Sequence, residues 1–145
     1  MCSYEVRRVR EEDYHDIHKL NQQLGYEYNE ELVKERISNL LETGTDIISV
    51  LEEAGSVVGY IHGIPYNTLY ADNLINMVAI VFNTEKQIEQ NHKEQLYKEF
   101  EKRVLKNGYH GIRLTVDNAR DLLHEFLKEN GFENKRDLKH YIKYF

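Results

Sequence analysis

Histidine and aspartate side chains near the amino end have a spacing that could hold a metal ion. Asp13, His15, Asp16 and His18 fall in one predicted helical stretch, and residues three apart on a helix are neighbours. A zinc site in a protein uses three or four such ligands, and no third strong ligand falls in register here. The stretch is therefore interpreted as a solvated helix face, and no metal site is predicted.

Tyrosine is unusually frequent, with eleven residues against no tryptophan. A tyrosine ring offers apolar area and one hydroxyl group, which suits contact with a small polar ligand or with a partner surface. Tyr26 and Tyr28 lie in a predicted connection between two helices, and Tyr66 and Tyr70 lie in a predicted loop before an apolar strand. These four residues are candidates for ligand contact, with half-buried packing as the alternative.

The composition excludes several classes of protein. A chain of 145 residues and 17.3 kDa fits a single domain over residues 1–145. The net charge of −6 and the pI near 5.6 argue against a nucleic-acid partner. No apolar run reaches the ~18 residues that span a bilayer, and one cysteine, Cys2, permits no internal disulfide. We expect a cytoplasmic protein with no membrane partner.

The elements that must position these side chains follow from the hydrophobic pattern. Apolar and β-branched runs predict strands over residues 4–10, 46–53, 57–65, 74–82, 112–116 and 138–145. The second and third of these strands are joined by the short turn 53–56, which indicates a β-hairpin. The fourth strand is almost entirely apolar, so we expect it to be buried on both faces.

Helical spacing predicts four helices, over residues 11–24, 29–44, 87–107 and 120–130. Asn29 is a predicted N-cap, and glycines follow the expected helix ends. The second helix has an apolar stripe at Leu32, Val33, Ile37, Leu40 and Leu41, and the third has one at Leu96, Phe100, Val104 and Leu105. The order β-α-α-β-β-β-α-β-α-β predicts a mixed α/β fold, in which helices cover both faces of a central, mixed, twisted sheet.

Four runs of sequence are similar, in order and spacing, to the GNAT superfamily of acyl-CoA N-acyltransferases. They are Val58-Gly59-Tyr60-Ile61-His62, Tyr70-Ala71-Asp72-Asn73-Leu74, Gly111-Ile112-Arg113-Leu114, and Arg120 with His124, Phe126, Gly131 and Phe132. The resemblance covers essentially the whole chain. It implies the GNAT fold, in which the fourth and fifth strands splay apart.

The resemblance also implies acetyl-CoA as donor and a set of residues that would hold it. The pantetheine would pair with the fourth strand at Val78, Ala79, Ile80 and Val81, where a backbone N–H would also stabilise the oxyanion. The pyrophosphate would bind the start of the third helix, over Gln87, Ile88, Glu89, Gln90, Asn91, His92 and Lys93. Arg120 and Leu127 of the fourth helix complete the predicted cofactor contacts.

The chain departs from the family pattern in three segments. Gln90 and His92 stand where the phosphate-binding loop has small residues, Asn76 stands where a glutamate base often lies, and Leu127 replaces a proton-donating tyrosine. Strain at two bulky loop residues and lost phosphate hydrogen bonds would weaken acetyl-CoA binding by about two to four decades.

Other residues are therefore candidates for the proton transfers. His62 and Tyr70 are neighbours that could move protons, Asn76 occupies the base position, and His124 lies one turn before Leu127. A structural role for His62 and a packed or solvent-facing role for His124 are the alternatives. Tyr26, Tyr28 and Tyr66 would line the walls of the acceptor site, by the same resemblance.

Two functions remain open at this point. One is an acetyl-CoA-dependent N-acetyltransferase that acts on an amine of a small metabolite or peptide, with full or weak activity. The alternative is a catalytically inactive GNAT-fold protein that serves as a ligand sensor or a protein-interaction module. A homodimer is plausible in either case, with the predicted strand 138–145 as a candidate contact.

Overall fold

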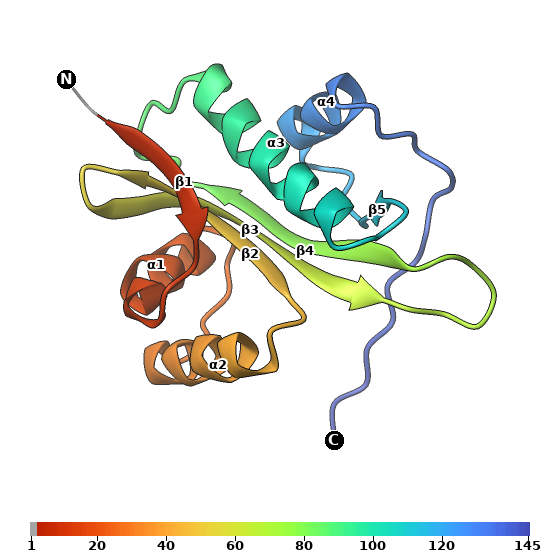
Figure 1. Ribbon diagram of the computed structural model, residues 1–145, viewed down its shortest axis with the longest axis horizontal. Coiled ribbons are helices and arrows are strands. Elements are labelled where there is room, and N and C mark those ends of the chain that lie inside the picture. The colour runs from red at the N-terminus through yellow and green to blue at the C-terminus, as the bar shows by residue number, and fades with distance from the viewer. Residues whose placement is uncertain (1–2) are drawn as a thin grey trace. The chain divides into compact units, whose positions relative to one another are not determined.

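The computed structural model describes residues 3–145, so Cys2 lies outside the described residues. The chain divides into two compact units, Met1–Arg113 and Leu114–Phe145. Each unit is described by itself, and the single domain expected over residues 1–145 stays a prediction. The larger unit contains the whole sheet and three of the four α-helices (Figure 1).

The sheet has five strands in the order β1-β2-β3-β4-β5. β1 (Tyr4–Arg8), β2 (Ile47–Glu53), β3 (Ser56–Tyr66) and β4 (Leu74–Phe82) pair antiparallel in sequence order. β5 (Ile112–Arg113) joins β4 in parallel after a helical crossover. This arrangement confirms the predicted mixed sheet in an α/β fold.

Helices cover both faces of the sheet in the larger unit (Figure 1). α1 (Tyr14–Gln23) and α2 (Glu30–Thr43) lie on one face, where Ile17, Val33 and Tyr60 belong to one buried apolar cluster. α3 (Gln90–Lys106) lies on the other face, and its Phe100 ring packs against Gly63 of β3. Neighbouring residues on a strand point to opposite faces, so Tyr60 and His62 point to the α1–α2 face and Gly63 to the α3 face.

Local sequence signals set several element boundaries. The Asn29 side chain accepts hydrogen bonds from the N–H groups of Glu31 and Leu32, and it therefore caps α2 as predicted. α2 ends at Gly44, whose φ of 71° few other residues adopt. β2 and β3 are joined by the two-residue turn Ala54-Gly55, with both φ angles positive, as a tight hairpin requires.

An ion-pair network fixes the first strand to the chain that follows it. The Arg7 guanidinium donates two hydrogen bonds of 2.9 Å to the buried Asp13 carboxylate, and it also bonds Glu52 on β2. These bonds, those to Asp13 foremost, raise the pKa of Arg7 above its usual value. Asp13 ends the short 3₁₀ helix η1 (Glu11–Asp13), so the network holds η1 and the start of α1 against the edge of the sheet.

Three expectations about the elements were wrong in detail. α3 begins at Gln90 and not at Gln87, and Leu105 of its predicted stripe is exposed. Leu32 and Leu41 of α2 are also exposed, because the apolar surface of the sheet beneath α2 is already covered by Val33 and Ile37.

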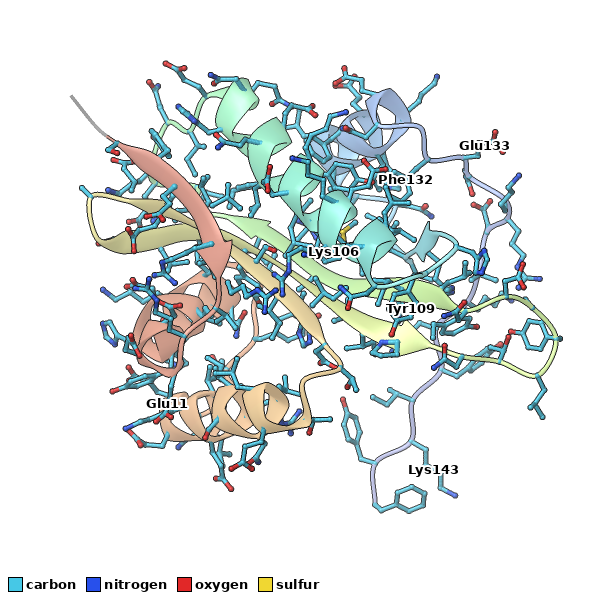
Figure 2. All side chains as sticks on the ribbon, in the orientation of Figure 1. Glu11, Lys106, Tyr109, Phe132, Glu133 and Lys143 are labelled. Carbon is cyan, nitrogen blue, oxygen red and sulfur yellow. The ribbon has the colours of Figure 1, made fainter. Side chains whose placement is uncertain are left out.

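Figure 2 marks Lys106 and Tyr109 at the carboxyl end of α3, where the turn to β5 begins.

The smaller unit contains one helix, α4 (Asp121–Glu129), which ends near Gly131 as predicted. The expected strand over residues 138–145 does not form. Its residues are exposed, and they are paired with no strand among residues 3–145. Lys139 and Lys143 interrupt the apolar run, and a strand without a partner leaves its backbone groups unpaired. Across residues 3–145, no helix is long and apolar enough to cross a membrane.

The close packing of Gly63 gives a first prediction. A Cβ at this position would lie 2.6 Å from Ile75 Cγ2 and 2.7 Å from Phe100 Cζ, so the Gly63→Ala variant should be less stable by about 1–3 kcal/mol. Urea unfolding followed by circular dichroism measures the change. Gly111→Ala is the control, because its Cβ meets only the end of the Leu74 side chain, at 3.2 Å. Equal losses in the two variants would contradict this account.

Candidate functional site

β4 and β5 are paired over only a short part of β4. β5 pairs with β4 only at Ile75↔Ile112 and Asn76↔Arg113, so the segment Met77–Phe82 has no partner on β5. This divergence is the splay that was predicted between the fourth and fifth strands. An open strand edge presents backbone N–H and C=O groups to any extended ligand that lies along it.

A β-bulge lies at the point where the two strands diverge. The β3–β4 register passes from His62↔Ala79 to Gly63↔Met77, which leaves Val78 without a partner on β3. A bulge bends its strand and changes the direction of the local backbone groups. The Val78 side chain is 49% exposed, although it lies within the most apolar strand of the chain. The expectation that this strand is buried on both faces therefore fails at Val78.

The other predicted β4 residues differ from Val78 in burial. Ile80 and Val81 are buried, and Ala79 is half-buried against the apolar cluster on the α1–α2 face. Their side chains are engaged in packing, so these three residues offer a ligand no polar side chain.

The start of α3 offers backbone N–H groups at its first turn. Glu89 is the N-cap, with no side-chain cap hydrogen bond, and the Gln90 and Asn91 N–H groups precede the first intrahelical donors. Gln90 is exposed, and its amide donates to Glu94 Oε1 at 3.3 Å. Gln87, Ile88 and Glu89 form the approach to this turn as loop rather than as helix.

His92 is packed against the first strand. Its ring stacks on the Tyr4 ring with centroids 3.8 Å apart and an interplanar angle of 17°. Its Nδ1 atom is buried without a hydrogen-bond partner. The nearby lysines are also engaged, since Lys86 lies 3.8 Å from Glu53 Oε1 and the Lys93 ammonium lies 5.3 Å from the centroid of the Phe82 ring.

His62 forms a pair with Asp46, which lies just before β2. The His62 Nε2 atom is 2.7 Å from Asp46 Oδ2, and both side chains are partly buried. An imidazole held by a carboxylate at one nitrogen has a fixed orientation and tautomer. Because His62 pairs with Ala79, it lies beside the Val78 bulge, on the α1–α2 face of the sheet.

A second polar group lies on the same face, near the start of β4. Arg113 Nη1 donates to Asn76 Oδ1 at 2.9 Å, and the guanidinium lies over the Tyr66 ring at 4.4 Å from its centroid. The Tyr66 and Tyr70 hydroxyls are 3.2 Å apart. Three of the predicted site residues, Tyr66, Tyr70 and Asn76, are therefore brought together around Arg113.

A cavity of about 220 Å³ lies between the α1–α2 layer and the sheet. Most of its lining is apolar, and its polar members are Asn21, Tyr28, Arg36, Tyr60 and His62. The Tyr60 hydroxyl donates to Asn21 Oδ1, and Tyr28 is among the lining residues. Tyr26 is 63% exposed and is not among the lining residues.

The predicted residues of the fourth helix belong to the smaller unit. Arg120 precedes α4 as its N-cap, Leu127 is buried, and His124 is exposed with Nε2 2.9 Å from the Asp117 carbonyl oxygen. The Asp117 contact satisfies one nitrogen of His124 within its own unit.

Sequence reasoning missed three polar residues of the larger unit, namely Asp46, Arg113 and Arg36. Asp46 is sixteen residues from His62, and only the β2–β3 hairpin brings them together. Arg113 lies between the apolar residues Ile112 and Leu114, and a charged residue at this position was the signal that could have marked it as a site residue. Arg36 is one of many charged residues on α2, and nothing in its spacing distinguishes it.

Comparison with known proteins identifies the fold. No family model and no curated protein matches the sequence. The aminoglycoside N-acetyltransferase AAC(6')-Iy in complex with CoA matches with a TM-score of 0.83 and 12% identity, over 99% of this chain and 96% of that one. A GNAT family acetyltransferase from Staphylococcus aureus matches at 0.75 and 17%, over 99% of both chains. Glucosamine-6-phosphate N-acetyltransferase from Arabidopsis thaliana matches at 0.79 and 15%, over 99% of both. The chain therefore has the GNAT acyl-CoA N-acyltransferase fold.

The burial of Tyr60 beside the cavity predicts that the stability of the protein depends on pH. Burial raises the pKa of Tyr60 from 10.0 to about 12, so the folded protein holds this proton longer than the unfolded chain does. The resulting contribution to stability is complete below pH 10 and is lost as the pH rises towards 12. Urea unfolding should show that the free energy of unfolding falls between these pH values. The fall should be smaller in Tyr60→Phe and unchanged in the control Tyr141→Phe, which alters an exposed tyrosine.

Proposed function

Because the chain has the GNAT fold, we propose that it transfers an acetyl group from acetyl-CoA to an amine of a small molecule or peptide. The observation that supports this most is the edge of β4 at the Val78 bulge, where β5 has already separated from β4. That edge can pair with the amides of a pantetheine chain as an added strand would. CoA is present in the AAC(6')-Iy complex, whose fold this chain shares.

The residues at the two ends of this edge differ in how well they suit CoA. At the bulge end, Val78 has no partner on β3 and its own side chain is apolar. The phosphate end offers the Gln90 and Asn91 N–H groups and the positive end of a seventeen-residue helix. His92 stands in the place of a small residue, but its ring is packed on Tyr4. We therefore assign the greater obstruction to the Gln90 side chain.

The pair His62–Asp46 suits the proton transfer that acetylation needs. Bound acetyl-CoA supplies an acetyl thioester. His62 accepts the proton of the acceptor ammonium, while Asp46 keeps the ring oriented and balances the positive charge that the imidazole gains. The neutral amine nitrogen forms the new C–N bond as the C–S bond breaks. The nitrogen then loses its second proton, and the departing thiolate gains one, with Tyr70 or solvent water carrying the proton from the nitrogen to the sulfur.

Two other features fit this assignment. Asn76 stands in the usual base position, but its amide cannot accept the proton near neutral pH, and its oxygen is already bonded to Arg113. Backbone N–H groups around Val78 would stabilise the negative charge that develops on the carbonyl oxygen. The fold itself does not select one amine, since the neighbours named above are named for acceptors as different as an aminoglycoside and glucosamine-6-phosphate.

CoA binding is the first test of the proposal. Titration of ¹⁵N-labelled protein with CoA should shift the amides of Val78–Val81 and those of Gln90 and Asn91. Gln90→Gly removes an exposed side chain at the first turn of α3, and we expect it to bind CoA about tenfold more tightly, because the phosphates can then approach the backbone of this turn without steric obstruction.

Gln95→Gly is the matched control for this variant. It places the same change at an exposed position of α3 beyond its first turn, and it should leave the affinity unchanged. Absence of any amide shift at millimolar CoA would exclude the proposed function.

The catalytic pair gives a second test. If His62 is the proton acceptor, His62→Ala should lower kcat by about 10²–10⁴-fold at neutral pH, and Asp46→Asn should give a smaller loss through the orientation of the ring. Release of the CoA thiol, measured over a panel of primary amines, reports the rate. His110→Gln, at an exposed histidine outside the site, should keep the wild-type rate. A His62→Ala variant with wild-type kcat would remove His62 from the mechanism.

A further inference from the structure

Arg113 is held in place by neutral groups alone. Its Nη1 donates to the Asn76 amide oxygen at 2.9 Å, and its guanidinium lies 4.4 Å from the centroid of the Tyr66 ring. No carboxylate pairs with it among residues 3–145. Arg7, by contrast, binds two carboxylates. Arg113 therefore has a fixed position and a positive charge that the protein itself does not neutralise.

A guanidinium in this state is suited to bind an anion. Its planar fork of N–H donors matches a carboxylate or a phosphate group in a two-bond geometry. Partial burial strengthens such a bond, since water screens it less than at an open surface. The Tyr66 ring contacts the guanidinium by a cation–π interaction and leaves the remaining N–H groups free to donate.

The strand register places Arg113 on the same face of the sheet as His62. Asn76 pairs with Ile64 on β3 and with Arg113 on β5, and paired residues point to one face. His62, Ile64 and Tyr66 alternate along β3 and point to that face as well. Ile64 is two residues from His62, and β5 is the second strand from β3, so the backbones of His62 and Arg113 are offset by about 7 Å along the strands and about 10 Å across them. The imidazole and the guanidinium therefore bracket a gap that a small molecule can bridge.

We propose that Arg113 binds an anionic group of the acceptor, so that the substrates are small amines that also carry a carboxylate or a phosphate. The inference rests on the proposed acetyl transfer and names the acceptor class for that reaction. With the anion on Arg113, the amine several bonds away is directed towards His62 and the Val78 bulge. Amines with several positive charges and no anionic group are poor acceptors, because they meet an unneutralised guanidinium.

The test compares amines that differ only in the anionic group. Glycylglycine is paired with glycylglycinamide, and 3-aminopropyl phosphate with 3-aminopropanol. NMR titration of the free protein measures the dissociation constant of each probe. We expect the anionic member of at least one pair to bind about 10- to 100-fold more tightly, as charge-assisted hydrogen bonds predict. The two pairs distinguish a carboxylate from a phosphate.

Variants decide whether Arg113 is responsible. Arg113→Gln should abolish the preference within the pair, and Arg113→Lys, which keeps the charge without the fork, should retain part of it. Arg8→Gln is the matched control, because it removes an exposed arginine from β1, the opposite edge strand of the sheet. Circular dichroism establishes that each variant is folded.

Two outcomes overturn the inference: equal binding within both pairs, or a preference that survives in Arg113→Gln. The titration needs no CoA, so its failure is distinct from failure of the proposed function. Protein that binds CoA and acetylates glycylglycinamide as fast as glycylglycine would keep the proposed function and reject the anionic acceptor. Protein that binds no CoA would reject the function whatever the probes show.

Discussion

The short contact between β4 and β5 is the constraint from which the rest of the site follows. Parallel strands normally exchange hydrogen bonds along their whole length, but here the pairing covers only Ile75↔Ile112 and Asn76↔Arg113. Beyond these pairs, the segment Met77–Phe82 of β4 has no partner on β5. The bulge at Val78 lies at the start of that segment, so the strand bends where it loses its neighbour.

Close packing on the α3 face of the sheet keeps this arrangement in register. Gly59 and Gly63 of β3 have no Cβ, and the rings of Phe82 and Phe100 occupy the space that a Cβ would need. A slip of one residue along β3 would move every side chain to the opposite face. His62 would then leave the α1–α2 face, and its pairing with Asp46 would be lost. The same packing that buries the core therefore sets the position of the polar pair.

Much of the fold could be predicted from the sequence, because its signals are local. Asn29 before an amphipathic stripe, Ala54-Gly55 between two β-branched runs and the apolar run Leu74–Phe82 each specify one element. The site was predictable only in part. Asp46, Arg113 and the stacking of His92 on Tyr4 depend on contacts between residues far apart in the chain. The strand expected over residues 138–145 failed for a related reason, since a strand forms only where a partner is available.

The stack of Tyr4 on His92 joins the beginning of the chain to the first turn of α3. Whatever displaces β1 also acts on the residues proposed to meet the phosphates. A fusion partner or affinity tag is therefore better attached at the carboxyl end, where the exposed residues 133–145 form no helix or strand. Attachment before Tyr4 would place the added mass next to the aromatic contact, and a weak ligand response measured on such a preparation would reflect the fusion and not the native chain.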